Sequence, residues 1–501
     1  YLNIHQIVAA CEITGADAVH PGYGFLSENA KFADILDAHG ITFIGPTAEH
    51  IRLMGDKITA KQTAQDLGIP VVPGSAGEVT PENALETARK IGFPVLIKAT
   101  AGGGGRGMKV AKSEEDLDEA FNTARTEALA AFGNGAVYME KYLGKPRHIE
   151  IQVLGDGEGN AVHLGERDCS LQRRHQKIWE EANSPALNVE QRMNIGEICA
   201  AAMRKLKYRG AGTVEFLYEN GEFYFIEMNT RIQVEHPVTE MITGIDLVEE
   251  MIRVAYGEKL RLSQTDVKLN GWAVESRVYA EDPTRNFLPS TGRLVTYRPP
   301  VEGPDGDAIV RNDTGVYEGG EISIYYDPMI AKLCTWAPDR LTAIDAMSEA
   351  LDSFEVEGIG HNLPFLSAVM AHPRFYSGNI TTAFIAEEWP DGFHGVSPDN
   401  DQARLLASVA AYLNLVDEAR KTKISGTLAN HARKLGADFV AVGGDHYWPH
   451  AVTSEAGVTT ISYGDGIAHA VSSDSRSMAR SSASRSPAPA PAGGCAGAAS
   501  T

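Results

Sequence analysis

The stretch Gly212-Thr-Val-Glu-Phe-Leu-Tyr-Glu-Asn-Gly-Glu-Phe-Tyr-Phe-Ile-Glu-Met-Asn229 consists of two apolar runs joined by a Glu-Asn-Gly turn. Strong β-formers on both sides of a glycine-bearing turn predict a hairpin with strands over 212–218 and 222–229. A two-residue Asn-Gly turn would place Glu215 and Glu227 on opposite faces of the hairpin. A three-residue loop over 219–221 would place them on the same face, and this is the geometry we predict.

This carboxylate pair predicts a metal site. Carboxylates set in apolar strands are costly to bury without a partner, and Mg²⁺ prefers a few carboxylate oxygens together with phosphate oxygens. Asn229 stands beside Glu215 and Glu227 and adds a further oxygen. The alternative is a pair of solvent-facing glutamates on an edge hairpin.

A mixed run of acidic, basic and amide side chains follows, in Asn229-Thr-Arg231-Ile-Gln233-Val-Glu235-His-Pro. Arg231 offers a bidentate fork to a small oxyanion, and Glu235 can act as a base next to it. The run therefore predicts an anion pocket beside the metal pair. A surface cluster of salt bridges is the alternative.

Four consecutive glycines stand in Lys98-Ala-Thr-Ala-Gly-Gly-Gly-Gly-Arg-Gly-Met108, between two expected strands. Such a run costs backbone entropy, which favours a loop whose N–H groups approach phosphate oxygens. Lys98 supports this interpretation, although the spacing is not that of a P-loop. A flexible hairpin tip is the alternative.

Two further segments fit a nucleotide site. The segment Val137–Leu143 is an apolar strand that ends in a charged pair, as an adenine slot requires, although an ordinary strand has the same pattern. The segment Glu166–Lys177 is a basic loop in a chain of net charge −21, which suggests an anion site, although an isolated basic loop is more often a solvated surface.

Bulk properties limit the class of protein. A length of 501 residues predicts two or more domains. The net charge of −21 argues against nucleic acid or an anionic membrane as a partner, and no apolar run approaches a membrane span. Five cysteines without a CxxC pair favour a reducing compartment. Because the first residue is Tyr1, we expect the chain to begin inside a longer protein.

Periodicity predicts an α/β start followed by mixed α+β architecture. The strand over 148–154 alternates strictly, with His148, Glu150 and Gln152 on its polar side. Residues 272–336 are expected to be mostly β, and 424–452 show short strand-like alternation. Other helices are expected over 2–14, 29–39, 57–67, 81–91, 114–131, 189–206, 246–256, 340–355 and 399–418, and other strands over 16–20, 41–44, 95–99, 108–111 and 161–167.

These features together resemble the biotin carboxylase component of biotin-dependent carboxylases, an ATP-grasp enzyme. The resemblance covers about residues 1–390. It rests on HPGYGFLSEN at His20–Asn29, GDK at Gly55–Lys57, KATAGGGGRGM at Lys98–Met108, MEKYL at Met139–Leu143, RHIEIQVLGD at Arg147–Asp156, GERDCSLQRRHQK at Gly165–Lys177 and EMNTRIQVEHPVTE at Glu227–Glu240.

The resemblance implies a domain order. Residues 1–45 would be the C-terminal part of a truncated, parallel N-terminal α/β domain, and 46–70 a linker helix. Residues 71–143 would be the ATP-grasp lid with its mobile glycine-rich loop, and 144–390 the remainder of the ATP-grasp fold with the mixed β C-terminal biotin carboxylase domain. Residues 391–466 resemble the start of a subunit-contact region in acyl-CoA carboxylase α subunits, most like the propionyl-CoA carboxylase type. Residues 467–501 are expected to be a low-complexity tail without order.

The resemblance also implies roles for individual residues. Bicarbonate would be bound by Lys177, Arg231, Gln233 and Val234, with Glu235 as the base and Arg277 stabilising the biotin enolate. Mg²⁺ or Mn²⁺ would be bound by Glu215, Glu227 and Asn229. ATP would be bound by Lys57, Lys98, Gly103, Gly104, Gly105, Glu140, Lys141, Leu143, His148, Gln172 and His175.

A ligase of this family would carboxylate biotin on a carrier domain through carboxyphosphate. Implied partners are that biotinylated carrier domain and a carboxyltransferase β subunit, in a homo-oligomer or an α/β hetero-oligomer. The expected location is the cytoplasm of a bacterium, or the mitochondrial matrix in a eukaryote. Two alternatives stay open: another ATP-grasp ligase, such as a carbamoyl-phosphate synthetase half or a D-alanine ligase, and a non-catalytic nucleotide-binding fragment.

Two measurements distinguish these classes. We expect Mg-ATP to raise the melting temperature of the chain, since a ligand that binds only the folded state stabilises it. We further expect free biotin to increase phosphate release from ATP. A thermal shift without biotin-dependent phosphate release would favour the non-catalytic fragment.

Overall fold

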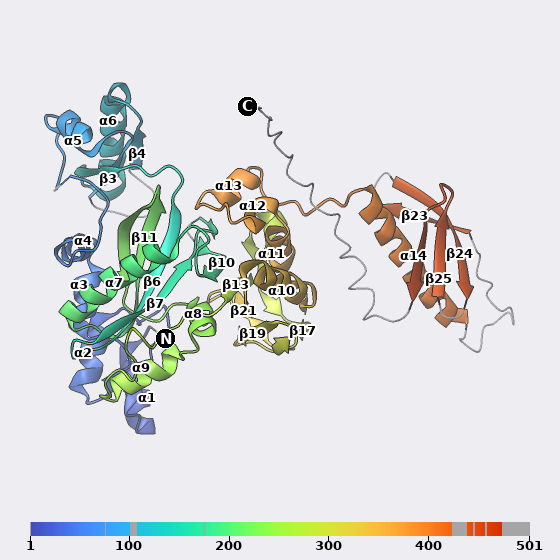
Figure 1. Cartoon of the computed structure of the whole chain (residues 1–501), viewed down its shortest axis with the longest axis horizontal. Coiled ribbons are helices and arrows are strands. Elements are labelled where there is room, and N and C mark those ends of the chain that lie inside the picture. Colours follow the sequence, from blue (N-terminus) through green and yellow to red (C-terminus); the bar gives the residue numbers. More distant parts are fainter. Residues whose placement is uncertain are drawn as a thin grey trace, which may run out of the picture. The chain divides into compact units, whose positions relative to one another are not determined.

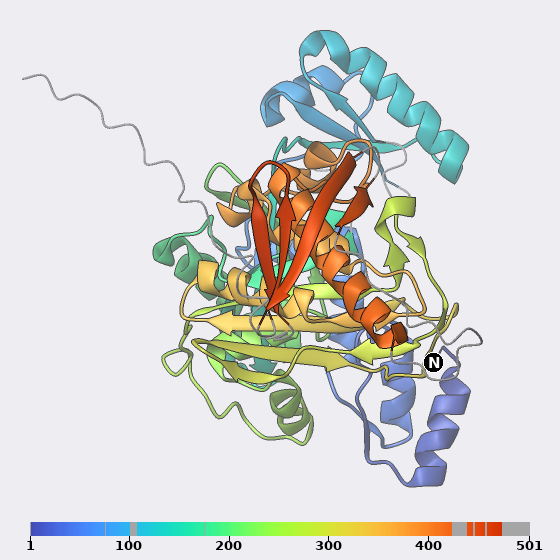
Figure 2. The same cartoon turned by 90° about the vertical axis from the view of Figure 1, so that its right-hand side faces the viewer.

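The chain divides by its own contacts into two units, Tyr1–Gly395 and Val396–Thr501. The structure is a computed structural model that describes residues 2–75, 77–100, 108–174, 176–422, 438–443, 446–455 and 458–472 (Figure 1). Figure 2 shows the same elements from the side. Among the described residues, no helix combines the length and apolar character that a bilayer crossing requires.

The first segment has the parallel α/β character that its sequence predicts. Strands β1 and β2 pair in parallel, with Ala18 opposite Thr42, and both are shorter than predicted. An apolar cluster that includes Phe32 and Leu36 packs beneath them. Asn29 and Asp56 cap the helices that follow them. The elements are α1 Ile4–Thr14, β1 Ala18–Val19, α2 Ala30–Ala38, β2 Thr42–Phe43, α3 Ala48–Gly55 and α4 Lys57–Asp66. The single linker helix predicted over 46–70 is thus two helices, α3 and α4, separated at Asp56.

The next segment is a small three-stranded sheet, ordered β4-β3-β5, with two helices against it. Val95, Ile97 and Met139 point into a core completed by Ala88 and Phe121. Residues 101–107, which carry the glycine run, lie outside the described part of the chain. The elements are α5 Ala84–Ile91, β3 Val95–Ala99, β4 Met108–Ala111, α6 Glu114–Phe132 and β5 Val137–Lys141.

A nine-stranded sheet, ordered β12-β11-β6-β7-β10-β13-β21-β19-β18, forms the centre of the first unit. Neighbouring strands in it are antiparallel. Its strands are β6 Arg147–Asp156, β7 Ala161–Asp168, β10 Trp179–Ala182, β11 Arg209–Glu219, β12 Glu222–Asn229, β13 Trp272–Tyr279, β18 Gly303–Asp305, β19 Ala308–Thr314 and β21 Met329–Ala337.

Helices cover this sheet on both sides. In Figure 1, α7 runs against β6 and β7, and its residues join Ile149, Ile151 and Val153 in one apolar cluster. Helix α8 packs against β7, β10, β13 and β21, and α10 against β13, β19 and β21. The helices are α7 Val189–Leu206, α8 His236–Thr243, α9 Leu247–Ala255, α10 Arg340–Asp352, α11 Leu363–Met370, α12 Pro373–Tyr376 and α13 Phe384–Glu388.

Short strand pairs connect these elements, and the predicted β character of 272–336 is confirmed. They are β8 Gln172–Arg173 with β9 Gln176–Lys177, β14 Glu281–Asp282 with β15 Leu288–Pro289, β16 Gly292–Arg293 with β20 Glu321–Ile322, and β17 Thr296–Arg298 with β22 Glu355–Glu357. A 3₁₀ turn, Pro283–Arg285, lies between β14 and β15.

The hairpin β11–β12 differs from its prediction in one respect. Glu219 pairs with Glu222, so the turn has two residues, Asn220 and Gly221, both at positive φ (54° and 89°). The predicted three-residue loop is therefore wrong. The extra residue lies instead in a bulge at Ile226, since Phe216 pairs with Phe225 while Glu215 pairs with Glu227. The bulge restores the predicted arrangement, with both carboxylates on one face.

The polar side of β6 is buried almost as completely as its apolar side. His148 is 9% exposed, and Glu150 and Gln152 are 0% exposed. Buried polar groups need partners, so the alternation predicted from the sequence indicates two buried faces here, one apolar and one charged.

The second unit packs one long helix against a four-stranded antiparallel sheet, ordered β23-β24-β25-β26. The predicted low-complexity tail from Ile467 begins too early, because β26 pairs with β25 and buries Val471. Residues 423–437 and 473–501 lie outside the described part of the chain. The elements are α14 Asn400–Thr422, β23 Asp438–Gly443, β24 His446–Glu455, β25 Val458–Tyr463 and β26 Ala468–Ser472.

Gly155 allows β6 to approach the segment before β11. A Cβ at this position would lie 2.3 Å from the carbonyl oxygen of Tyr208, a backbone atom that cannot turn aside. We expect Gly155→Ala to lower the free energy of unfolding by about 1–3 kcal/mol, measured by denaturant unfolding. The control is Gly144→Ala, whose nearest neighbouring atom is 4.0 Å away and whose effect should stay under about 0.5 kcal/mol. Equal effects of the two changes would contradict this reason.

Candidate active site

A row of four charged side chains crosses the nine-stranded sheet. Glu227 on β12 pairs with Glu215 on β11, Glu215 with Glu150 on β6, and Glu150 with Arg167 on β7. Directly paired residues point to the same face of a sheet, so all four side chains share one face. The polar face of this sheet is therefore the floor of the candidate site.

Lys177 on β9 binds three of the carboxylates around this floor. Its Nζ lies 2.5 Å from Glu150 Oε2, 2.7 Å from Glu235 Oε1 and 3.1 Å from Glu215 Oε1. Burial lowers the pKa of Lys177, but Glu150, Glu215 and Glu235 together raise it well above its usual value. Lys177 therefore remains an ammonium ion, although only 13% of its side chain is exposed.

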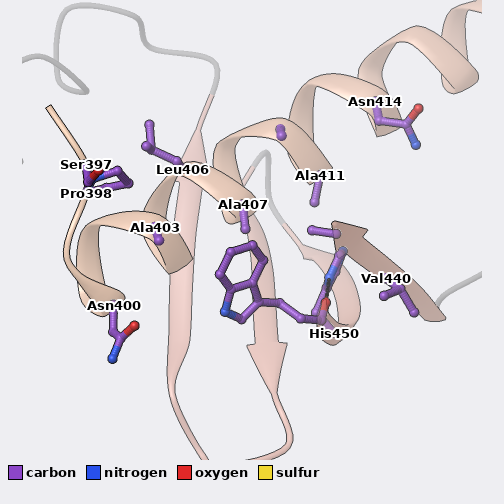
Figure 3. Close-up of a pocket in the computed structure, with 13 residues that line it drawn as sticks. Ser397, Pro398, Asn400, Ala403, Leu406, Ala407, Ala411, Asn414, Val440 and His450 are labelled. Carbon is purple, nitrogen blue, oxygen red and sulfur yellow. Dashed lines mark hydrogen bonds between the residues drawn. The ribbon is translucent and has the colours of Figure 1, made fainter. Parts of the chain in front are cut away.

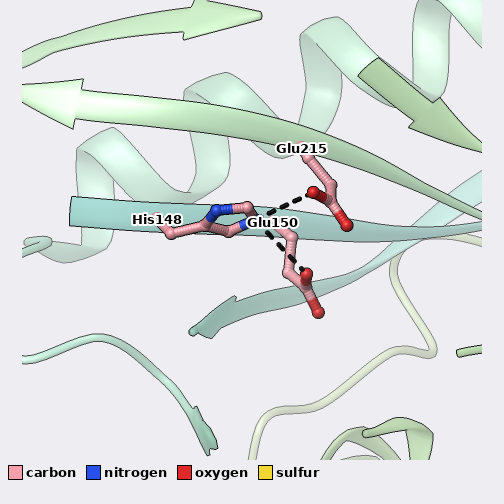
Figure 4. A group of neighbouring side chains, drawn as sticks. All are labelled: His148, Glu150 and Glu215. Atoms are coloured by element: carbon pink, nitrogen blue, oxygen red, sulfur yellow. Dashed lines mark ion pairs between the residues drawn. The ribbon is translucent and has the colours of Figure 1, made fainter. Parts of the chain in front are cut away.

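Figure 4 shows His148, Glu150 and Glu215 converging on β6 and β11. His148 Nε2 lies 2.9 Å from Glu215 Oε2 and 3.9 Å from Glu150 Oε2. Burial raises the pKa of Glu215, but Lys177 and His148 lower it below its usual value. Among the described residues this trio also groups closely enough to hold a metal ion, but imidazole is a poor ligand for Mg²⁺.

Gln233 and Arg231 enter the site from the loop after β12. Gln233 Nε2 donates to Glu215 Oε1 at 2.8 Å. Arg231 donates to Asn229 Oδ1 at 2.7 Å and to Glu28 Oε2 at 3.0 Å. Glu28 belongs to the HPGYGFLSEN motif, so the first segment of the chain helps to place Arg231.

Glu235 is held by cations on two sides. Besides Lys177, Arg277 Nη2 donates to Glu235 Oε2 at 2.8 Å and lies 2.6 Å from Glu180 Oε1. Burial raises the pKa of Glu235, but Lys177, Arg277 and Arg167 hold it well below its usual value. Glu235 is thus ionised and able to accept a proton.

The lid side carries a second ion cluster. Glu140 Oε2 accepts from Lys98 Nζ and Glu140 Oε1 from Lys61 Nζ, each at 2.6 Å. Burial raises the pKa of Glu140, but Lys98 and Lys61 lower it below its usual value. Lys141 Nζ turns back to the carbonyl oxygens of Gly92 and Phe93, at 2.9 and 3.0 Å.

The other residues predicted for the site have the following places. Gln172 on β8 donates to the carbonyl oxygen of Cys169 at 2.9 Å, and the Val234 carbonyl accepts from Lys332 at 3.1 Å. Leu143 is half-buried between β5 and β6. Lys57 begins α4, but its side chain is not described, and Gly103, Gly104, Gly105 and His175 lie outside the described residues.

Six residues whose side chains make these contacts were not predicted as site residues, one of them Lys332, which donates to the Val234 carbonyl. Five others also escaped prediction. Glu150 could have been found, since it lies in the alternating strand on the side of His148. The other four are Arg167, Glu180, Glu28 and Lys61, and their contacts depend on pairing between distant segments. Burial also raises the pKa of the Cys169 thiol well above its usual value, which makes it unreactive.

The donor set fits a hard divalent cation. Glu215 and Glu227 lie on the same face, and Asn229 Nδ2 donates to Glu215 Oε1 at 2.7 Å. Carboxylate and amide oxygens are the ligands that Mg²⁺ accepts together with phosphate oxygens. The Lys177 ammonium already compensates Glu215 from the other side.

The second unit contains a pocket of about 660 Å³ between α14 and the hairpin β23–β24 (Figure 3). Ala403, Leu406, Ala407 and Trp448 are among the residues that line it. The described residues that line it are mostly small and apolar, together with Asn400, Asn414 and His450.

Four descriptions of known families match the chain. "Biotin carboxylase, N-terminal domain" matches residues 1–51, and "Carbamoyl-phosphate synthase L chain, ATP binding domain" matches 56–263. "Biotin carboxylase C-terminal domain" matches 275–387, and "Propionyl-coenzyme A carboxylase BT domain" matches 406–479.

Three curated relatives show how far the similarity extends. The propionyl-CoA carboxylase alpha chain of Ruegeria pomeroyi is 54% identical over 491 residues, which cover 95% of this chain and 72% of that one. The biotin carboxylase of Nostoc sp. is 54% identical over 389 residues, 77% of this chain and 86% of that one. The human mitochondrial propionyl-CoA carboxylase alpha chain is 50% identical, and the match spans 84% of this chain and 58% of the human one.

Solved structures give the same result. The biotin carboxylase domain of a thermophilic 2-oxoglutarate carboxylase, bound to bicarbonate, superposes with a TM-score of 0.73 at 46% identity, covering 78% of this chain and 85% of that one. A biotin carboxylase complex from Campylobacter jejuni gives 0.70 at 49% identity, with 77% and 86% covered. The chain belongs to the biotin carboxylase family of ATP-grasp ligases. Its match to the Ruegeria pomeroyi propionyl-CoA carboxylase alpha chain continues through most of the second unit.

Glu180 and Glu275 make the stability of this site depend on pH. They lie directly opposite each other on β10 and β13, fully buried. Burial raises the pKa of Glu180 to about 8 against the opposing effect of Arg277, and raises that of Glu275 to about 7 against Lys332 and Arg277. An unfolded chain loses these protons near pH 4.3. Because the folded state binds more protons between about pH 5 and 8, its free energy of unfolding should fall as pH rises through that range.

We expect Glu180→Gln to reduce this fall by on the order of 1 kcal/mol, measured by urea unfolding at several pH values. Glu119→Gln, a change at an exposed residue of α6, is the control and should leave the slope unchanged. An identical pH slope in Glu180→Gln and the unchanged chain would contradict the raised pKa.

Proposed function

We propose that this chain carboxylates biotin with bicarbonate at the expense of ATP, as the first half-reaction of an acyl-CoA carboxylase. The observation that carries the proposal is Glu235, a buried carboxylate held between Lys177 and Arg277 above the row of charges on the sheet. A carboxylate between two cations suits the capture and deprotonation of a small anion. The family, and the bicarbonate-bound structure of a relative, support that reading.

Bicarbonate would bind to Lys177, Arg231, Gln233 and the backbone of Val234. An anion that shares Lys177 and Arg277 with Glu235 weakens their hold on that carboxylate, so the pKa of Glu235 rises toward a value useful for a base. Glu235 then takes the proton of bicarbonate, and the freed oxygen attacks the γ-phosphate of ATP. The products of this step are ADP and carboxyphosphate.

Arg277 would support the second step. Once Glu235 has accepted a proton, its attraction for Arg277 weakens, and the guanidinium can turn to the enolate oxygen of biotin. Carboxyphosphate breaks into CO₂ and phosphate, and phosphate takes the N1 proton of biotin. The biotin nitrogen then attacks CO₂. Burial of the site limits the access of water to carboxyphosphate.

The nucleotide would lie between the lid and the sheet, on the residues predicted for ATP. Lys98 would release Glu140 and bind phosphate oxygens instead. Lys57 and the glycine run Gly103–Gly105 would bind phosphate beside it. Glu215, Glu227 and Asn229 would hold Mg²⁺ or Mn²⁺, which when bound neutralises charge on the terminal phosphates. His148 and Gln172, with His175, would line the nucleotide site, and Glu140, Lys141 and Leu143 would hold the adenine.

The partners and location follow from the relatives and are part of the proposal. The match to a propionyl-coenzyme A carboxylase BT domain supports a carboxyltransferase β subunit as partner, propionyl-CoA as the final acceptor, and an α/β hetero-oligomer. A biotinylated carrier domain would bring biotin to Arg277. We propose the cytoplasm of a bacterium as the location, or the mitochondrial matrix in a eukaryote. A carbamoyl-phosphate synthetase-like ligase is less well supported. The chain matches the N-terminal and C-terminal biotin carboxylase domains as well as the ATP-binding domain named for carbamoyl-phosphate synthase.

Replacement of Glu235 tests the base directly. We expect Glu235→Gln to reduce bicarbonate-dependent ATP cleavage by about 100-fold or more, since a positioned base typically contributes 10²–10⁴-fold, while Mg-ADP still binds. Phosphate release with and without bicarbonate is the measurement. Glu249→Gln, at an ion-paired residue on the surface of α9, is the control and should retain full activity. Unchanged activity in Glu235→Gln would remove Glu235 from the mechanism.

A further inference from the structure

Arg167 on β7 is a fully buried arginine whose five N–H groups are all used. Nε donates to Glu150 at 2.5 Å, Nη1 to Gln152 at 2.6 Å and to Thr239 at 2.9 Å, and Nη2 to Gln233 at 2.7 Å and to Thr213 at 3.2 Å. A guanidinium has five donors in a fixed fork, so its orientation is completely determined here. The five acceptors come from β6, β11, α8 and the loop before α8.

We propose that Arg167 is the positioning residue of the bicarbonate pocket, which turns the Gln233 amide and the Glu150 carboxylate so that each presents the correct atom to the bound anion. The inference rests on the proposed function, and it assigns Arg167 no contact with substrate. It acts through two separate arms.

The first arm fixes the polarity of Gln233. An amide can present either its oxygen or its nitrogen, and only the nitrogen attracts an anion. Arg167 Nη2 donates to Gln233 Oε1 at 2.7 Å, which turns Nε2 toward Glu215 Oε1 at 2.8 Å. One N–H of Nε2 is engaged there, and the second is available for a bicarbonate oxygen. Without Arg167 the amide is free to reverse and to present an oxygen that repels the anion.

The second arm fixes Lys177. Arg167 Nε binds Glu150 Oε1, and Glu150 Oε2 binds Lys177 Nζ at 2.5 Å. Glu150 therefore divides its two oxygens between a structural cation and a functional one. Because Lys177 also binds Glu235 at 2.7 Å, a displaced Glu150 would move the cation that faces both the base and the anion.

A merely structural arginine would leave a different signature. It would only hold β6 and β7 together. Its loss would then lower the stability of the folded state and the affinity for every ligand by similar amounts. The arms described here end at Gln233 and Lys177, both predicted to hold bicarbonate, and neither ends at a residue of the lid. Loss of Arg167 should therefore affect bicarbonate selectively.

The test uses Arg167→Lys, which keeps a charge but loses the fork, and Arg167→Met, which loses both. We expect each variant to raise the half-saturating concentration of bicarbonate in bicarbonate-dependent ATP cleavage by about 10- to 100-fold. The affinity for Mg-ADP, measured by calorimetry, should change by less than about threefold. Thr239→Val is the matched control: it removes one contact of Arg167 but neither arm, and the bicarbonate requirement should stay within about twofold.

Two further measurements test the inference if one of these variants is unstable. In a double-mutant cycle, Arg167→Lys should cause a smaller loss in the Gln233→Ala background than in the unchanged chain, because one of its two arms is already removed. Millimolar guanidinium should restore bicarbonate use in Arg167→Ala by filling the vacated space. An unchanged bicarbonate requirement in the folded Arg167 variants, or equal losses of bicarbonate use, Mg-ADP affinity and melting temperature, would overturn the inference. If the unchanged chain itself shows no bicarbonate-dependent ATP cleavage, the proposed function fails instead.

Discussion

The structure depends on one constraint, the pairing register that places Glu227, Glu215, Glu150 and Arg167 in a row across four neighbouring strands. Strand pairing normally keeps like charges apart, because directly opposed carboxylates repel. Here three carboxylates are adjacent, and their repulsion is offset by two cations, one outside the row and one within it. Lys177 compensates Glu150 and Glu215 from β9, and Arg167 compensates Glu150 within the row itself.

This arrangement favours chemistry over stability. Buried ion pairs often contribute little to stability, because desolvation offsets their attraction. Their value here is that the pKa of Glu235 is held low while those of Glu180 and Glu275 are held high within the same group of side chains. Groups whose environments push their pKa values apart are typical of active sites. The same face of the sheet extends from Glu215 and Glu227 through Arg167 to Arg277, so the residues proposed for nucleotide, bicarbonate and biotin share one surface.

The hairpin shows how far sequence reasoning can go. Its strands and the shared face of Glu215 and Glu227 could be predicted, but the three-residue loop expected to produce that shared face was wrong. The turn has two residues because Asn220 and Gly221 both accept positive φ. A bulge at Ile226 in β12 then brings Glu227 back to the same face as Glu215. No local pattern in the sequence reveals that bulge, which appears only in the pairing register of β11 and β12. In the same way, the charged face of β6 was visible as alternation, but its complete burial follows from β7, β11 and α8.

The sequence by itself determined most element types, the motifs and most of the residues proposed for the site, because periodicity, glycine content and residue type act over a few neighbouring positions. Tertiary structure alone decided which charges meet. Arg167 contacts Gln233, 66 positions away, and Arg231 contacts Glu28, 203 positions away. Such contacts depend on the register of strand pairs and on the placement of loops that are far apart in the sequence. The residues next to either partner give no indication of the contact.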